Sequence, residues 1–144
     1  MTLRDEQGST IVEFGVCSAV LFMSLFGVIG LCGALYSYVF VSEAARDAAR
    51  YALVRGSECT GFSDCGITSA QLNTYVKTLA HPGLNTNNLT AAASWSGSVN
   101  PTFNGPGNVV TVTVNYNFPL NIPFWPKSGS TIHLSSSSQM VISQ

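Results

Sequence analysis

Charged side chains are scarce in this sequence: Asp, Glu, Lys and Arg make up 9% of its 144 residues, and the net charge is −1. So neutral a chain lacks the basic surface that nucleic-acid binding requires. The scarcity is greatest between residues 14 and 42, where none of these four residue types occurs over 29 positions. About 20 apolar residues suffice to span a bilayer core. The sequence therefore predicts a membrane-spanning segment at about residues 14–42, followed by one small domain.

Catalytic and metal-binding patterns are also missing from the sequence. The only histidines, His81 and His133, are far apart and lack the spacing of zinc ligands. No Ser or Cys lies in a nucleophile elbow, and no glycine-rich phosphate loop occurs. We therefore predict a protein that is not an enzyme, with no cofactor, no metal, no small-molecule substrate and no nucleic-acid partner.

Proline is absent between residues 9 and 55, which predicts one continuous helix over this stretch. Its apolar run is about twice as long as the hydrophobic core of a signal peptide, which favours an uncleaved anchor. Gly56 is expected to end the helix because glycine accepts a positive φ.

The last part of this helix, residues 43–55, is amphipathic. One side, which already begins at Val41, carries Ala45, Ala48, Ala49 and Ala52, and the other carries Glu43, Arg46, Asp47 and Arg50. Ion pairs are expected between Glu43 and Arg46 and between Asp47 and Arg50, each at a separation of three residues.

Residues 56–144 are predicted to form a small α+β domain. Thr68 and Gln71 form a capping-box pattern that begins a second, short helix. Its expected inner side carries Leu72, Val76 and Leu79, and His81-Pro82-Gly83 is expected to end it. Alternating apolar and polar residues predict strands at about 89–96, 110–118 and 131–142, with Pro119 to Gly129 as a break between the last two. The simplest architecture packs the amphipathic helix half on a three-stranded antiparallel sheet.

Glu13 is the unusual residue, because a carboxylate at the head of a membrane helix is costly unless it is paired. It lies five residues after Gly8, and Phe14 follows it. A short polar leader ending in Gly, followed by a helix with Glu at its fifth position, resembles the type IV prepilin processing motif. The later segment from Ala44 to Ala52 includes Ala45, Arg46, Ala49, Arg50 and Tyr51. Together with Glu13-Phe14, it is similar to the TadE-like minor pseudopilins of the tight-adherence (Tad, type IVc) pilus. This similarity covers roughly residues 4–56.

The resemblance implies a pilin-like fold, whose long N-terminal helix has its second half on a sheet. It also implies a leader at residues 1–8, removed by a prepilin peptidase that cuts between Gly8 and Ser9. Glu13 and Phe14 would then act in helix pairing during assembly. The implied partners are the peptidase, the major pilin, other minor pseudopilins, the Tad membrane platform and the inner membrane.

Orientation in the membrane must be weighed between opposing signals. Arg46, Arg50 and Arg55 follow the apolar run, whereas only Arg4 precedes it, and basic residues usually stay cytoplasmic. Cys59 and Cys65, however, lie in one polar loop, a placement that suits a disulfide in an oxidising compartment, although spacing alone does not prove the bond. A prepilin leader is also cytoplasmic. We therefore expect a single-pass protein of the bacterial inner membrane with its C-terminal domain outside the cytoplasm.

Two alternative functions remain open from the sequence. One is a pseudopilin of a type II secretion system, which the Glu-Phe pair and the Ala-Ala-Arg segment disfavour. The other is a single-pass anchored β domain that serves as a binding or adhesion module without filament assembly. An uncut N-terminus and a monomer in detergent would favour the second alternative.

Overall fold

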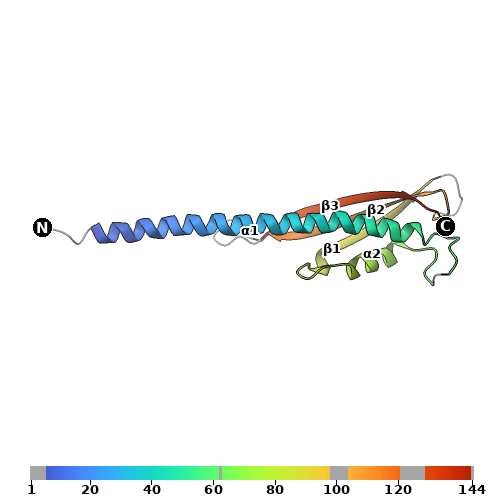
Figure 1. Cartoon of the computed structure of the whole chain (residues 1–144), viewed down its shortest axis with the longest axis horizontal. Coiled ribbons are helices and arrows are strands. Elements are labelled where there is room, and N and C mark those ends of the chain that lie inside the picture. The colour runs from blue at the N-terminus through green and yellow to red at the C-terminus, as the bar shows by residue number, and fades with distance from the viewer. Residues whose placement is uncertain (1–5, 62, 98–103, 121–128, 144) are drawn as a thin grey trace.

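The computed structural model describes residues 6–61, 63–97, 104–120 and 129–143. A long helix, α1 (Glu6–Leu53), runs into a domain that contains a short helix, α2 (Ser69–Thr78), and a 3₁₀ turn, η1 (Thr86–Asn88). Three strands complete it: β1 (Leu89–Ser96), β2 (Val109–Leu120) and β3 (Ser130–Val141). In Figure 1 the N-terminal half of α1 projects far beyond the domain, while its C-terminal half lies along the sheet. The predicted α+β architecture is confirmed.

The long helix ends earlier than predicted, and for a different reason. Its last helical residue is Leu53, and the amide of Arg55 donates to the carbonyl of Ala52 in the turn that follows. Gly56 does not have the positive φ that we expected. It is buried, and its carbonyl accepts hydrogen bonds from the amides of Cys59 and Gly66. The glycine is therefore used for close packing under the disulfide loop.

The sheet is antiparallel with the order β1-β2-β3. Alternate residues of β2 face inward, and Val110, Val112, Val114 and Tyr116 are buried. Pro119, predicted to interrupt the chain, instead lies within β2 and pairs with Thr131 of β3. The prediction was wrong because β1 reaches only as far as Tyr116. Beyond that point no strand among the described residues pairs with β2 on its β1 side, so a proline is tolerated there.

The short helix α2 begins as predicted and protects the edge of the sheet. Thr68 caps it, and the capping box with Gln71 is present. The helix ends at Thr78, before the expected stop at residues 81–83. In the edge strand β1, the backbone amides of Ala91 and Ala93 donate hydrogen bonds to the side chains of Asn73 and Ser69, at 3.0 and 3.1 Å. These contacts satisfy backbone groups that would otherwise invite another strand to pair.

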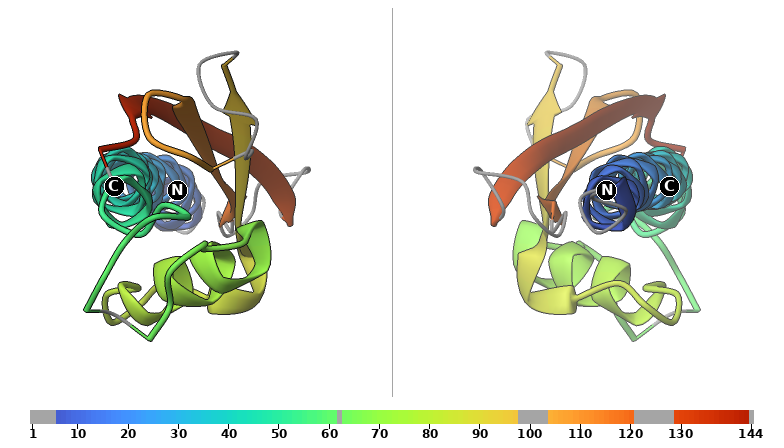
Figure 2. Two further views of the ribbon diagram at one scale, coloured as in Figure 1. Left: turned by 90° about the vertical axis from the view of Figure 1, so that its right-hand side faces the viewer. Right: turned by 90° about the vertical axis from the view of Figure 1, so that its left-hand side faces the viewer.

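The core lies between α1, the inner face of the sheet and α2. Helix α1 contacts β2 and β3, and α2 contacts β1, so the two helices lie side by side on one face of the sheet (Figure 2). By strand register, Ser136 and Ser138 of β3 are on the same face as Val114 and Val112. The small serines of β3 thus meet the small alanines of α1, which permits a close helix–sheet approach.

Candidate functional site

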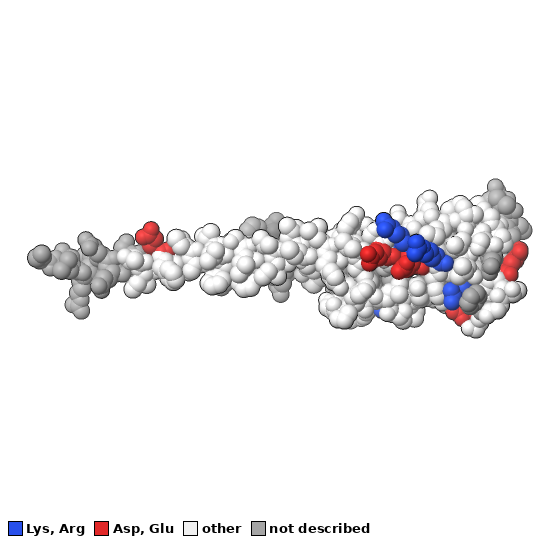
Figure 3. Space-filling model, in the orientation of Figure 1, with Lys and Arg blue, Asp and Glu red and all other residues white. Residues whose placement is uncertain are grey.

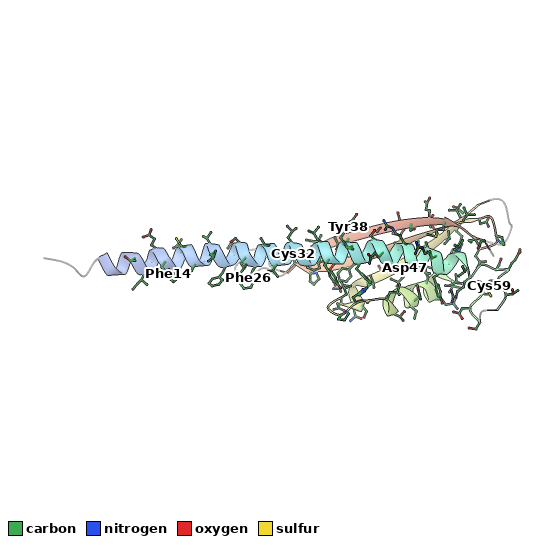
Figure 4. The ribbon with its side chains drawn as sticks, in the orientation of Figure 1. Phe14, Phe26, Cys32, Tyr38, Asp47 and Cys59 are labelled. Atoms are coloured by element: carbon green, nitrogen blue, oxygen red, sulfur yellow. A yellow bond between two sulfur atoms is a disulfide. The ribbon has the colours of Figure 1, made fainter. Side chains whose placement is uncertain are left out.

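The first candidate region is the bare part of α1. Up to about residue 32 the helix is apolar and open to solvent, and the exposed fraction of the Phe14 side chain is 74%. Figure 4 shows Phe14, Phe26 and Cys32 along this part, at increasing distance from its free end. By length and composition α1 can cross a membrane, and it is the candidate membrane anchor of the chain. The free cysteines, Cys17 and Cys32, are exposed on it.

Hydroxyl groups in the apolar part of α1 bond to the helix itself. Ser18 donates to the carbonyl of Gly15, Ser24 to that of Leu21 and Ser37 to that of Gly33, at 2.8–2.9 Å. A hydroxyl that bonds to its own helix leaves no polar group needing water. Ser18 and Ser24 are therefore compatible with a bilayer around the helix, whereas Ser37 is buried against the domain.

The predicted processing residues lie together at the exposed N-terminal end of α1. Gly8 is exposed and within the helix, and a Cβ built on it would meet no atom within 4 Å. Glu13 is exposed five residues further on and pairs with no cation in the described part of the chain. Leader residues 1–5 lie outside the described residues. Cleavage between Gly8 and Ser9, and a pairing role for Glu13 and Phe14, stay predictions.

The segment from Ala44 to Ala52, which we call the Ala-Arg motif, divides into a buried half and an exposed half. Ala45 and Ala49 are fully buried against the sheet, whereas Arg46 and Arg50 point to solvent. The two alanines therefore set the distance between α1 and the sheet. Of the two ion pairs expected here, Arg50–Asp47 is present at 3.8 Å. The Glu43–Arg46 pair does not form, since these two exposed residues lie beyond 4.0 Å of each other.

Tyr51, near the end of the Ala-Arg motif, is the centre of an aromatic and charged cluster. Its ring stacks on Tyr75 of α2 at 3.9 Å, and the guanidinium of Arg55 lies 3.7 Å from its centroid. Its hydroxyl donates to Asp64 Oδ2 at 2.9 Å, and Arg55 Nε lies 3.6 Å from the same oxygen. We call Tyr51, Arg55, Asp64 and Tyr75 the Tyr51 cluster. It ties the end of α1 to α2 and to the following loop.

Two pKa values are shifted in the Tyr51 cluster. Partial burial, together with the hydrogen bond to the Asp64 carboxylate, raises the pKa of Tyr51. Hydrogen bonds from Ser63 and Tyr51, with the nearby Arg55 charge, lower the pKa of Asp64. Both shifts favour a neutral tyrosine that donates to an ionised aspartate.

Cys59 and Cys65 are joined by a disulfide, with their Cα atoms 5.5 Å apart. The bond closes the loop that follows α1. On one side of the loop, the amides of Gly66 and Ile67 donate to the carbonyl of Arg55 at 3.1 and 3.2 Å. Because Asp64 is adjacent to Cys65, the disulfide also holds the carboxylate of the Tyr51 cluster in place. Figure 4 shows Cys59 at the end of the domain farthest from the free end of α1.

Comparison with known proteins supports the assignment over the helix. The model of the family described as TadE-like protein matches residues 8–50. Over these residues the chain is similar to that family. The TadE-like match begins at Gly8 and includes Glu13 and most of the Ala-Arg motif. No curated protein and no solved structure matches the chain.

Sequence reasoning missed two features of this region. Tyr51 was recognised only as part of a motif, and nothing in its surroundings in the sequence indicates Asp64 or Tyr75 as partners. The contact of Gly33 with Phe118 of β2 was also missed; a Cβ on Gly33 would lie 3.2 Å from the Phe118 ring. The one usable signal was that Gly33 precedes the alanine-rich side of the helix.

Proposed function

We propose that the chain is a minor pseudopilin, a structural and assembly component of a Tad-type adhesive pilus. The TadE-like match associates the chain with the Tad pilus. The observation that carries the proposal is the open head of α1, where Gly8 is accessible and Glu13 has no partner within the described part of the chain. A prepilin peptidase would cut after Gly8 and release Ser9 as the new N-terminus.

The domain limits the part of α1 that a bilayer can surround. From Gly33 onward one side of the helix is covered by β2 and β3, beginning with Phe118 and buried Ala34. Residues 14–32 then remain, and 19 residues of helix measure about 28 Å, close to the ~30 Å of a hydrocarbon core. We therefore place the membrane boundary near residue 32 rather than 42. The disulfide supports an extracytoplasmic domain and a cytoplasmic leader.

Pairing at the head of the helix is the proposed mechanism of assembly. After the cut, the ammonium group of Ser9 and the carboxylate of Glu13 would both lie near the membrane, where each needs a partner of opposite charge. If the amine of one subunit pairs with Glu13 of its neighbour, each satisfies the other and the two helices acquire a fixed axial offset. The proposed neighbours are the major pilin and sibling minor pseudopilins, assembled on the Tad platform.

Mass spectrometry of the mature protein tests the cut. The proposal expects a chain beginning at Ser9, and expects Gly8→Arg to leave an uncut chain and a cell without pili, because a peptidase pocket fitted to glycine excludes a large side chain. A chain that keeps Met1, or normal piliation in the Gly8→Arg strain, would overturn the proposal.

Substitution of Glu13 tests the pairing separately. Glu13→Gln removes the charge and leaves Gly8 for the peptidase, so cleavage should continue while pili and crosslinks to other pilins fall sharply. Leaving the Ser9 amine of the neighbouring subunit without a carboxylate partner would cost about 2–3 kcal/mol on insertion scales. Glu13→Asp, which keeps the charge, is the matched control and should retain more assembly. Wild-type pili in the Glu13→Gln strain would contradict the pairing mechanism.

A further inference from the structure

A pocket between α1 and the end of α2 takes no part in the proposed processing or head pairing. It has a volume of about 320 Å³ and lies beside Glu43 and Asp47 of α1 and Leu79 and His81 beyond α2. Phe40 lies at its floor, with its ring edge-on to His81 at 5.4 Å. Two carboxylates and two rings thus surround a hollow large enough for a side chain.

The two carboxylates of this pocket are at most weakly paired within the described part of the chain. Glu43 is exposed and has no ion-pair partner among the residues that the structure describes. Asp47 is half exposed, and its contact with Arg50 is long, at 3.8 Å. The pocket is therefore suited to a cationic group from outside.

The same helix presents an unused cation on its other flank. Arg46 is exposed and, among the described residues, pairs with no carboxylate. At about 100° per residue, Arg46 is turned roughly 60° around the helix from Glu43, away from Asp47. Figure 3 shows this separation: over α1 the acidic side chains lie on the side toward α2, and the basic ones lie next to them on the side away from α2. One helix thus carries an acidic pocket and, on another flank, a free guanidinium.

We propose that the pocket of one copy binds Arg46 of a second copy of this chain, placed parallel beside it. Three residues separate Glu43 from Arg46, so parallel helices shifted by about 4.5 Å bring the two groups to one level. The planar guanidinium can bond to carboxylate oxygens while its face lies along a ring. Each copy uses one flank for its pocket and the other for its arginine.

This contact is heterologous, because two different surfaces meet. Such contacts generate an open row of subunits unless the rotation closes a ring. The inference deepens the proposed function by naming a second copy as a partner, and it rests on that function for its biological setting. The contact itself needs neither the cut after Gly8 nor the charge of Glu13.

Charge reversal in the full-length chain tests the contact. In detergent micelles at low salt, with Cys17→Ser and Cys32→Ser to remove free thiols, self-association is measured by sedimentation velocity. Glu43→Arg and Arg46→Glu are each expected to weaken association roughly tenfold or more, because like charges then meet. An equimolar mixture of the two should associate again, since Arg46 of the first variant fits the intact pocket of the second. Ser137→Glu, on the exposed outer face of β3, is a control expected to have no effect.

A zero-length crosslink identifies the contact itself. A Glu43→Gln/Arg46→Lys chain is mixed with the unsubstituted chain and treated with a carbodiimide, which joins an ammonium to a carboxylate in contact. A link from the lysine introduced by Arg46→Lys to Glu43 can then form only between two copies, and mass spectrometry should find it. A monomeric chain, unchanged association in either reversal, no recovery in the mixture, or no such link would each overturn the inference.

The outcomes separate this inference from the proposed function. If the N-terminus is still Met1 but the crosslink forms, the function fails and the contact stands. If Glu13→Gln abolishes pili while Arg46→Glu leaves both pili and association intact, the contact fails and the function stands. Circular dichroism of each variant checks folding, which should be unchanged because both side chains are exposed.

Discussion

Breaking the disulfide should loosen the junction between α1 and the domain by a predictable amount. The Cys59–Cys65 bond spans a sequence separation of 6. For a loop this short, the chain-entropy estimate gives about 2 kcal/mol of stabilisation. In a domain of roughly 100 residues, 1 kcal/mol corresponds to about 4–8 °C in melting temperature. A Cys59→Ser/Cys65→Ser chain should therefore melt roughly 8–16 °C below the unsubstituted chain.

The loss should be felt in the Tyr51 cluster as well as in the loop. Asp64 is adjacent to Cys65 and accepts the hydrogen bond of Tyr51. Without the disulfide, no crosslink in the loop holds Asp64 against Tyr51 and Arg55. The effects of Tyr51→Phe and of the double serine substitution should therefore be less than additive, which a double-mutant cycle measures.

Thermal unfolding in detergent micelles, followed by near-ultraviolet circular dichroism, measures both effects because the stacked Tyr51 and Tyr75 rings contribute to the signal. Cys17→Ser/Cys32→Ser is the matched control: it also removes two sulfurs, but from the exposed, unbonded cysteines, and should leave the melting temperature unchanged. An unchanged melting temperature in the Cys59→Ser/Cys65→Ser chain would refute this reasoning about the loop. Additive effects in the cycle would refute only its link to the Tyr51 cluster.

Three further predictions follow from packing and charge. Ala49→Leu should lower the free energy of unfolding by about 1–3 kcal/mol, because Ala49 is fully buried against the sheet, whereas Arg50→Ala should change it by less than about 0.5 kcal/mol in the same denaturation assay. Gly33→Leu should displace Phe118 and raise its accessibility to labelling, whereas Gly27→Leu, which meets nothing within 4 Å, should not. Because the pKa of Asp64 is lowered in the folded protein, its ionised carboxylate stabilises the fold at pH values above the usual pKa of 3.8. This contribution is lost as the pH falls through the lower folded pKa. Asp64→Asn should therefore flatten the acid side of the stability–pH profile. Normal acid sensitivity in that variant would contradict the assignment.

Much of the fold follows from periodicity that the sequence displays openly. The β1 range was predicted to the residue, because Leu89, Ala91, Ala93 and Trp95 alternate with small polar or alanine positions between clear turn residues. The start of α2 was equally clear, since a capping box is a local signal that needs no tertiary context. Local hydrogen bonding and strict alternation are the properties that one chain reveals by itself.

The errors occur where a distant segment decides the local structure. Pro119 can lie in β2 only because β1 stops short of it, and no property of residues 119–120 indicates where β1 ends. Gly56 has no positive φ because the loop after it folds back onto its carbonyl. The expected Glu43–Arg46 pair is a different case, since it does not form although Asp47 and Arg50 pair at the same spacing, and nothing in the structure explains the difference.

One helix therefore serves two environments, and the change between them occurs at Gly33. Between Phe14 and Cys32 every side of α1 is uncharged, mostly apolar and uncovered, so only lipid or other helices can satisfy it. After Gly33 the alanines face the sheet, which leaves the opposite side to carry the charges of Glu43, Arg46, Asp47 and Arg50. Such a helix is uncovered on all sides before Gly33 and charged on one side after it, so few neighbours can pack along its whole length. A parallel helix of the same design meets both requirements at once, because it offers an apolar surface at the level of the membrane and opposite charges at the level of the domain.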